Sequence, residues 1–376
     1  MAFDPFSLVR PEARGSLPFA PGPPVDELER RLGIAQAARL AANENALGPS
    51  PRALEAIART AASGHRYPDG GGTHLKRRLA EILDLTPGHL ALGVGSTELI
   101  DLLMRLFVGP GDEVVTAHPT FVLYGPAVRL AGGTLVAVPG KDGGIAHDLD
   151  AMQAAIGPRT RVVIVCNPNN PTGALVAREE FARFLARVPK HVVVVSDEAY
   201  HEYVEDPAYP RTLDHLGDDR PLVILRTFSK IHSLAGLRIG YAIARPEVAG
   251  LFDRVRLPFN VSSVAQAAAL AALDDGAHVE ASRALARQGR AALRRDLEAL
   301  GVRACPSHTN FVLADFGRDC RPTCQALAER GVLIRDLVAF GMESRFARIG
   351  IGTEAEHARL IEALRAVLQS AARGAA

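Results

Sequence analysis

The chain has 376 residues, 48% of them hydrophobic, which is enough for two or three domains or one large α/β domain with a smaller companion. Its 43 basic and 42 acidic side chains nearly cancel, which argues against a protein that binds nucleic acid. We see no secretion signal and no run long enough to span a membrane, so we expect no membrane partner and a cytoplasmic protein. The four cysteines are Cys166, Cys305, Cys320 and Cys324, and we interpret them as free thiols of a protein in a reducing compartment.

The N-terminal part of the chain contains turn formers before any regular element. Residues 1–25 are rich in proline and glycine, which indicates an extended arm. The stretch "DELERRLGI" at 26–34 predicts a short helix. A second helix is expected to begin at Pro51, because proline suits the first helical position and Ser50 is a suitable N-cap.

The middle of the chain alternates between strand-like and helical patterns. Helical segments such as "REEFARFLARV" separate several short runs rich in valine and isoleucine, which is typical of a parallel sheet covered on both faces. We therefore predict a doubly wound, mainly parallel α/β domain over residues 42–272. The seven strand-like runs are "LALGVGS", "DEVVTAH", "GTLVAVP", "RVVIVC", "HVVVVSDE", "PLVILRT" and "RIGYAIA".

The pattern changes after residue 272. A long amphipathic helix, "VEASRALARQGRAALRRDLEAL", leads to three short strands, "TNFVLADF", "GVLIRDL" and "FARIGIGT", and a final helix, "EAEHARLIEALRAVL". We predict a smaller α+β domain over residues 273–376 and expect the N-terminal arm, residues 1–41, to contribute to it.

Polar residues follow several of the predicted strands, where open α/β sheets bind ligands. In "GVGSTE", the turn at Ser96 and Thr97 offers free N–H groups and a helix dipole to a phosphate, although either residue could be an ordinary N-cap. In "VCNPNNPTG", Asn170 can direct an amide at a ligand or belong to a tight turn.

Charged residues follow two further strands. Asp197 ends the apolar run "VVVVSDEAY" with Tyr200 three residues later, and a buried carboxylate there needs a salt bridge, a cap role or a cationic ligand. Lys230, in "TFSKIHS", can be a desolvated amine that forms an imine or a lysine that reaches water from a strand end. Arg238, in "GLRIG", can bind an anion or form a surface ion pair.

Together these candidate groups match the chemical features of one cofactor, pyridoxal phosphate. They are a phosphate site, an amide, a carboxylate with a tyrosine, and a lysine with an arginine. The chain resembles the fold-type I pyridoxal-phosphate aminotransferases, and among them the histidinol-phosphate aminotransferases. The resemblance covers almost the whole chain. It is specific for the cofactor class and less specific for the substrate, and it rests on "NENALGPSP", "RYPDGGGTHLK", "CNPNNPTG", "SDEAYHEYV", "TFSKIHSLAGLRIGY", "NFVL" and "RIGIGT".

The resemblance implies roles for the residues of these motifs. Lys230 would hold the cofactor covalently and then move the substrate proton, and Asp197 would keep the pyridine nitrogen protonated. Asn170 and Tyr200 would hydrogen-bond the phenolic oxygen, and Phe121 would stack on the ring. The residues that would bind the phosphate are Ser96, Thr97, Ser229 and Arg238.

Other implied roles concern the substrate and a second subunit. Tyr67 would reach the phosphate of the neighbouring subunit, which implies a homodimer with shared sites. Arg348 would bind the acidic end of the substrate, Arg335 would be a second such arginine, and Asn43 would lie near the site. The substrates would be a small-molecule amino donor and a 2-oxo acid acceptor, and the twelve histidines form no metal-ligand pattern.

Two departures leave the substrate open. Relatives often have Pro-Tyr where this chain has Pro18-Phe19, and they have proline at Ala46. The predicted function is transfer of the amino group from histidinol phosphate to 2-oxoglutarate in histidine biosynthesis. The alternative is an aromatic amino acid aminotransferase. A threonine-phosphate decarboxylase would share the same motifs. A cofactor-binding DNA regulator is disfavoured by the short arm and the near-neutral charge.

Overall fold

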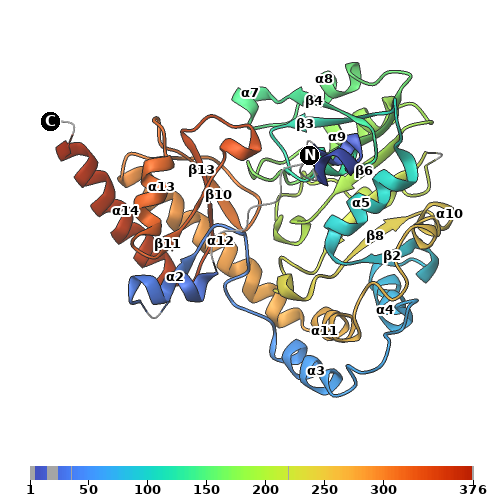
Figure 1. The fold of residues 1–376 in the computed structure, drawn as a ribbon, viewed down its shortest axis with the longest axis horizontal. Helices are drawn as coiled ribbons and strands as arrows, with labels where there is room; N and C mark the ends of the chain where they lie inside the picture. The colour runs from blue at the N-terminus through green and yellow to red at the C-terminus, as the bar shows by residue number, and fades with distance from the viewer. Residues whose placement is uncertain (1–4, 15–23, 35, 219, 375–376) are drawn as a thin grey trace.

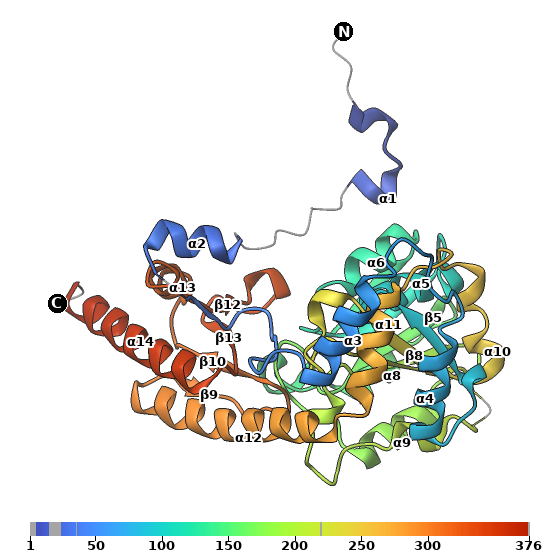
Figure 2. The ribbon, with the colours of Figure 1, turned by 90° about the horizontal axis from the view of Figure 1, so that it is seen from below.

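The computed structural model describes residues 5–14, 24–34, 36–218 and 220–374 of the chain. The ribbon has a larger part built around one sheet and a smaller part that carries the C-terminus (Figure 1). The long helix α12 (Gly276–Ala299) runs along the smaller part and begins next to the larger one (Figure 2).

Seven strands form the sheet of the larger part, in the spatial order β2-β8-β7-β6-β5-β3-β4. Only β8 runs antiparallel to its neighbours, so the sheet is mainly parallel, as predicted. These strands are β2 (Leu90–Gly93), β3 (Glu113–His118), β4 (Thr134–Pro139), β5 (Thr160–Cys166), β6 (Val193–Asp197), β7 (Leu222–Thr227) and β8 (Gly240–Ala244). Each one corresponds to one of the seven valine- and isoleucine-rich runs.

Helices cover both faces of this sheet, which explains why its central strands are apolar at successive positions. Along β5, Val163 and Val165 pack on one face, and Val162 and Ile164 pack on the other. The first face is covered by α3 (Pro51–Ala61), α4 (Thr73–Leu83), α8 (Leu149–Ala154), α9 (Arg178–Arg187) and α11 (Ser263–Leu273). The second face is covered by α5 (Gly95–Phe107), α6 (Tyr124–Leu130) and α10 (Pro246–Ala249). The doubly wound prediction is confirmed, and Ser50 caps α3 as expected.

The smaller part has a four-stranded antiparallel sheet in the order β12-β13-β10-β9. Its elements are β9 (Arg303–Ala304), β10 (Phe311–Asp315), β12 (Arg335–Asp336), β13 (Phe346–Gly350), α13 (Arg321–Ala328) and α14 (Glu354–Gly374). The segment β1 (Ala38–Arg39) pairs in parallel with β11 (Val332–Leu333), so residues before position 41 join the smaller part. The run "GVLIRDL" is therefore two short strands in two sheets. The domain limits at residues 41 and 272 stay a prediction.

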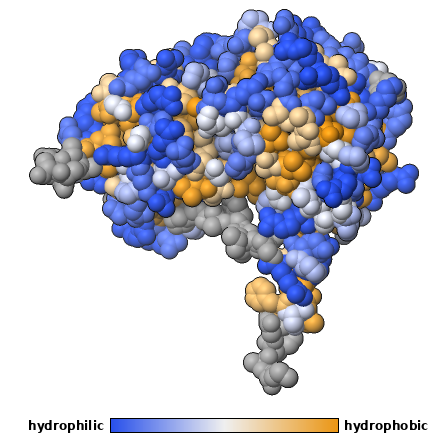
Figure 3. Space-filling view, turned by 90° about the horizontal axis from the view of Figure 1, so that it is seen from above, coloured by the Kyte–Doolittle hydropathy of each residue, from blue (hydrophilic) through white to orange (hydrophobic). Residues whose placement is uncertain are grey.

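The described residues of the arm form short helices where the sequence predicted an extended segment. They are η1 (Pro5–Leu8) and α1 (Pro11–Arg14), whereas α2 (Val25–Leu32) confirms the short helix predicted at 26–34. Phe6 and Leu8 are 67% and 77% exposed, and apolar residues are visible where the arm projects from the body (Figure 3). Pro18 and Phe19 lie outside the described residues.

Short helical turns complete the described structure. They are η2 (Pro87–His89), α7 (Lys141–Gly144), η3 (His201–Tyr203), η4 (Thr212–His215), η5 (Ala235–Leu237), η6 (Phe252–Arg254) and η7 (Val338–Phe340). Within the described ranges, no helix combines the length and the apolar character needed to cross a bilayer.

Candidate active site

The predicted cofactor residues meet at one edge of the seven-stranded sheet. The strands β2, β3, β5, β6 and β7 are parallel to one another, so their carboxyl ends lie at the same edge. Asp197 is the last residue of β6, and Lys230 follows β7 by three positions. Ser96 follows β2, Phe121 follows β3 and Asn170 follows β5 at the same edge.

The Lys230 amine has backbone carbonyl groups as its hydrogen-bond partners. Its Nζ donates to the carbonyl oxygens of Asn43 at 3.2 Å and Ala42 at 3.4 Å, and it lies 5.6 Å from the centroid of the Tyr200 ring. No acidic side chain of the described residues forms an ion pair with it. Loss of hydrating water, with a smaller effect from Arg348, lowers the pKa of this amine to about 7. A lysine of this kind is uncharged often enough near neutral pH to attack a carbonyl.

Asp197 is a carboxylate without a cation. It is 3% exposed, Tyr124 Oη donates to its Oδ2 at 2.6 Å, and the Ala199 N–H donates to its Oδ1 at 3.3 Å. In the part of the chain that the structure describes, no lysine, arginine or histidine pairs with it. Burial raises its pKa to about 6. A buried carboxylate of this kind is costly unless a positive group lies against it, and a protonated ring nitrogen would meet this need.

Tyr200 and Asn43 form a buried pair beside the lysine. Asn43 Nδ2 donates to Tyr200 Oη at 2.9 Å, and burial raises the pKa of Tyr200 to about 12. The phenol therefore stays protonated at neutral pH and has its own hydrogen available for a ligand oxygen. Asn43 has a left-handed backbone, with φ 56°, and its buried Oδ1 lacks a partner within the described ranges. Such an orphaned acceptor is consistent with a ligand at this place.

The turn after β2 has the properties of an anion site. Helix α5 begins at Gly95, its N-cap residue is Val94, and no side chain caps it. The alternative that Ser96 or Thr97 is an ordinary N-cap is therefore wrong. The hydroxyls and backbone N–H groups of these half-buried residues lie at the positive end of a 13-residue helix.

Arg238 adds a guanidinium group to this turn. A Cβ atom at Gly95, where φ is 76°, would lie 2.4 Å from Arg238 Nη2, so only glycine permits this approach. Arg238 Nη1 also donates to Ser229 Oγ at 3.3 Å. The structure thus brings together all four residues predicted to bind a phosphate.

Arg348 is a buried guanidinium with no carboxylate partner in the described residues. It is 5% exposed and donates to Asn170 Oδ1 at 2.5 Å and to the Ala41 carbonyl oxygen at 2.8 Å. Its Nε lacks a partner among the described residues, and its guanidinium lies 5.4 Å from the ring centroids of Phe311 and Phe340. Burial, with a contribution from Arg335, lowers its pKa to about 10.

Arg335 lies beside Arg348 in the small sheet. The two residues are register partners in the antiparallel pair β12–β13, so their side chains leave the same face of the sheet. No hydrogen bond or ion pair joins Arg335 to another described residue. Two like charges in direct opposition are unfavourable, and an anionic ligand between them would remove the conflict. Residue type alone predicts that both arginines are exposed on a strand. This prediction is wrong for Arg348, which is buried.

Two contacts of the site were not predicted from the sequence. Tyr124 donates to Asp197 and lies edge-on to Phe121, with ring centroids 5.4 Å apart. Asn310 Nδ2 donates to the backbone oxygens of Asn43 at 3.0 Å and Glu44 at 3.2 Å. A tyrosine three residues after Phe121 and an asparagine directly before β10 were the available signals.

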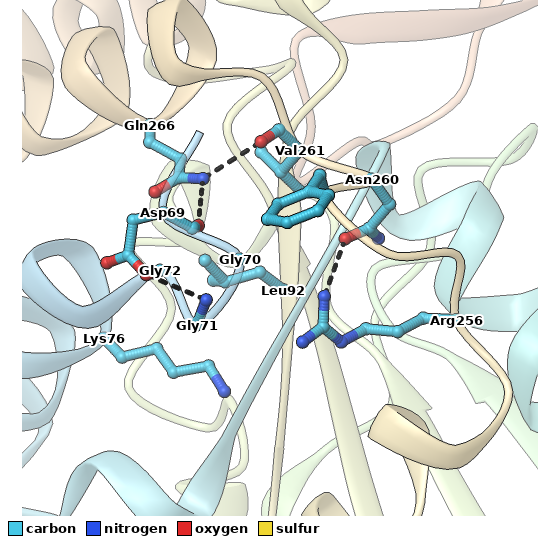
Figure 4. Close-up of a pocket in the computed structure, with 11 residues that line it drawn as sticks. Asp69, Gly70, Gly71, Gly72, Lys76, Leu92, Arg256, Asn260, Val261 and Gln266 are labelled. Carbon is cyan, nitrogen blue, oxygen red and sulfur yellow. Dashed lines mark hydrogen bonds between the residues drawn. The ribbon is translucent and has the colours of Figure 1, made fainter. Parts of the chain in front are cut away.

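Tyr67 lies apart from this cluster, on the surface. It is 83% exposed and stacks on Phe259, with centroids 4.8 Å apart. The loop after it is held firmly, because Gln266 Nε2 donates to the backbone oxygens of Asp69 and Val261, both at 3.0 Å (Figure 4). Within this chain Tyr67 makes no contact with the predicted phosphate residues.

These observations agree with a bound pyridoxal phosphate. The site offers a lysine amine for the aldehyde, an unpaired carboxylate for the ring nitrogen, polar side chains for the phenolic oxygen and an anion turn for the phosphate. No group of three or more histidine, cysteine or acidic residues in the described ranges has the geometry of a metal site.

The sequence profile of the family "Aminotransferase class I and II" matches residues 36–364. The chain belongs to the class I and II aminotransferases. Histidinol-phosphate aminotransferase 2 of Pseudomonas aeruginosa is 46% identical over 97% of this chain and 99% of its own length. Histidinol-phosphate aminotransferase of Moorella thermoacetica is 44% identical over 93% of this chain and 90% of its own length. The resemblance to these aminotransferases is confirmed.

Solved structures of this family have the same fold. Histidinol-phosphate aminotransferase from Sinorhizobium meliloti, in complex with pyridoxal-5′-phosphate, has a TM-score of 0.87 at 34% identity and covers 98% of both chains. A double mutant of Thermus thermophilus aspartate aminotransferase has a TM-score of 0.82 at 27% identity over 96% of this chain and 99% of its own. The predicted fold-type I architecture is therefore confirmed.

Proposed function

We propose that this chain is a pyridoxal-phosphate-dependent histidinol-phosphate aminotransferase, which exchanges the amino group between histidinol phosphate and 2-oxoglutarate in histidine biosynthesis. The observation that carries the proposal is the pair of unbalanced groups at one sheet edge, the Lys230 amine with a lowered pKa and the buried Asp197 carboxylate. Relatives that are 42–46% identical carry the name of this activity.

When it is bound, pyridoxal phosphate supplies an electron sink for the charge left on the substrate carbon after proton removal. The uncharged Lys230 amine would accept the proton from the substrate Cα and donate it to the cofactor C4′, a role that requires a pKa near neutrality. The Asp197 carboxylate holds a proton on the ring nitrogen. Tyr200 and the Asn170 amide donate to the phenolic oxygen, and the turn at Ser96 holds the phosphate.

Arg335 and Arg348 are proposed to bind the acidic end of each substrate. Histidinol phosphate presents a phosphate where 2-oxoglutarate presents a carboxylate, so one pair of guanidinium groups can serve both. The absence of a carboxylate partner for Arg348 and Arg335 in the described residues supports this role. The rings of Phe311 and Phe340 lie beside the Arg348 guanidinium.

A half-reaction panel tests this function. Holoenzyme is mixed with histidinol phosphate, phenylalanine, tyrosine or phosphothreonine, and the cofactor absorbance is followed. We expect histidinol phosphate to convert the cofactor at the lowest concentration. Conversion only by phenylalanine or tyrosine would assign an aromatic aminotransferase, and carbon dioxide release from phosphothreonine would assign a decarboxylase. No conversion with any of the four would overturn the proposal.

We also propose a homodimer in which Tyr67 completes the phosphate site of the partner. Its support is the exposure of Tyr67, Phe259 and Leu257, at 83%, 45% and 68%. Mixing and refolding the Lys230→Ala and Tyr67→Ala proteins creates hybrids with one intact site, so activity should return to about a quarter of the wild-type value from random pairing. No recovery of activity in the mixture would contradict shared sites.

The four free thiols support the cytoplasmic location, which stays a prediction.

A further inference from the structure

One buried side chain connects two of the proposed cofactor contacts. Tyr124 is 1% exposed and lies at the start of α6, on the second face of the sheet. Its hydroxyl donates to Asp197 Oδ2 at 2.6 Å, a distance typical of a hydrogen bond to an ionised carboxylate. Its ring is edge-on to Phe121, at a centroid distance of 5.4 Å and an interplanar angle of 80°.

We infer that Tyr124 is a positioning residue for the cofactor: it holds the Asp197 carboxylate ionised and oriented toward the ring nitrogen, and it fixes the plane of Phe121. This inference rests on the proposed function, because Asp197 and Phe121 act on pyridoxal phosphate there. Tyr124 itself does not need to touch the cofactor. The hydrogen bond occupies Oδ2, and Oδ1 receives only a long bond of 3.3 Å from the Ala199 N–H, so Oδ1 is the oxygen available to the ring.

The charges around Asp197 make this donor important. Glu198 lies next to it on the chain, and its charge raises the pKa of Asp197. Cys166 and Tyr200 also face the carboxyl group, and burial raises the pKa of each to about 12, so both are neutral at physiological pH. None of these neighbours supplies a positive charge. The Tyr124 hydroxyl is therefore the strongest group within the described residues that favours the ionised carboxylate.

The pH dependence follows with a defined sign. Burial raises the pKa of Asp197 to about 6, and the Tyr124 hydrogen bond acts in the opposite direction. Removal of the hydroxyl raises the pKa further, so the carboxylate is lost at a higher pH than in the wild type. Because the wild-type pKa is about 6, the ionised fraction at pH 6.5 falls several-fold in the variant, whereas at pH 9 both proteins are largely ionised.

The test measures pyridoxal phosphate binding to the full-length apoprotein between pH 6 and 9. Tyr124→Phe should bind the cofactor several-fold more weakly than the wild type at pH 6.5, with a difference below about twofold at pH 9. Tyr209→Phe is a matched control, since it removes another phenol hydrogen bond, to the Asn167 carbonyl oxygen at 2.8 Å, and should leave binding unchanged. An equal loss for Tyr124→Phe at every pH would overturn the inference.

A second measurement separates this inference from the proposed function. In the Asp197→Asn background, Tyr124→Phe should change the affinity for pyridoxal phosphate less than twofold, because the carboxylate on which it acts is absent. A full additional loss there would show that Tyr124 acts independently of Asp197. If Asp197→Asn itself binds pyridoxal phosphate as tightly as the wild type, the proposed cofactor role of Asp197 fails, whatever Tyr124→Phe does.

Discussion

Replacement of Arg348 by glutamine separates substrate binding from stability. The side chain is 5% exposed and has no carboxylate partner in the described part of the chain. Its pKa falls from the usual arginine value to about 10, which corresponds to about 3 kcal/mol against the charged form in the folded protein. Removal of the charge recovers this energy, and loss of the hydrogen bonds to Asn170 and Ala41 costs about the same amount. The unfolding free energy should therefore change by less than about 1 kcal/mol.

Substrate binding, unlike stability, should be strongly weakened by Arg348→Gln. A buried guanidinium that pairs with a substrate anion contributes about 3 kcal/mol, so kcat/KM of Arg348→Gln should fall roughly 150-fold for both substrates. The loss should appear mainly in KM, because the same contact exists before and during the reaction. Unchanged kcat/KM for both substrates would refute the reasoning.

A matched control is available three residues earlier. Arg345 is 36% exposed and pairs with Asp315 and Glu343, so it already has its carboxylates. Arg345→Gln should leave KM unchanged. Urea unfolding of the apoproteins supplies the stability comparison, and steady-state kinetics supplies the rest. A large stability loss for Arg348→Gln would mean that this arginine is structural.

Three further predictions concern the cofactor site. Asp197→Asn should stabilise the apoprotein by about 3 kcal/mol above pH 6. The folded-state pKa of about 6 exceeds the unfolded value of 3.8, so this carboxyl group makes the wild-type protein less stable as pH rises from 3.8 to 6. The same difference in unfolding free energy between variant and wild type at pH 5 and at pH 8 would contradict this. Lys230→Met should stabilise the apoprotein most below pH 7 and progressively less as pH rises from 7 to 10.5, because folding lowers the lysine pKa to about 7. An equal difference in unfolding free energy at pH 7 and pH 10.5 in urea unfolding would refute this. Gly95→Ala should weaken pyridoxal phosphate binding about tenfold or more, because the new methyl group displaces Arg238. The control is Gly111→Ala. Gly111 has φ 90° and open space around it, so this variant has similar backbone strain without a clash and should bind pyridoxal phosphate normally.

The larger sheet was predictable because its strands are buried on both faces. Strands such as β5 and β6 are continuous valine and isoleucine runs, and this pattern has few other structural interpretations. The small strands were harder to predict. The run "GVLIRDL" divides between β11 and β12 because tertiary pairing with β1 and β13, and not local sequence, decides where each residue bonds.

The site was predictable where residue type and position agree. Lys230 and Asp197 are charged residues at the ends of apolar strands, so burial without a partner was a visible conflict. Tyr124 was not predicted, because a tyrosine at the start of a helix looks like ordinary core. Its role depends on the distance between α6 and β6, and only the folded structure contains that distance.

The identity of the lysine that carries pyridoxal phosphate is the most direct test. Holoenzyme is reduced with borohydride, digested and analysed by mass spectrometry, with Lys230→Ala as the control. A phosphopyridoxyl group on Lys230 in the wild-type protein, and on no lysine in the variant, is the predicted result. The same group on another lysine, such as Lys76 or Lys141, would contradict the account.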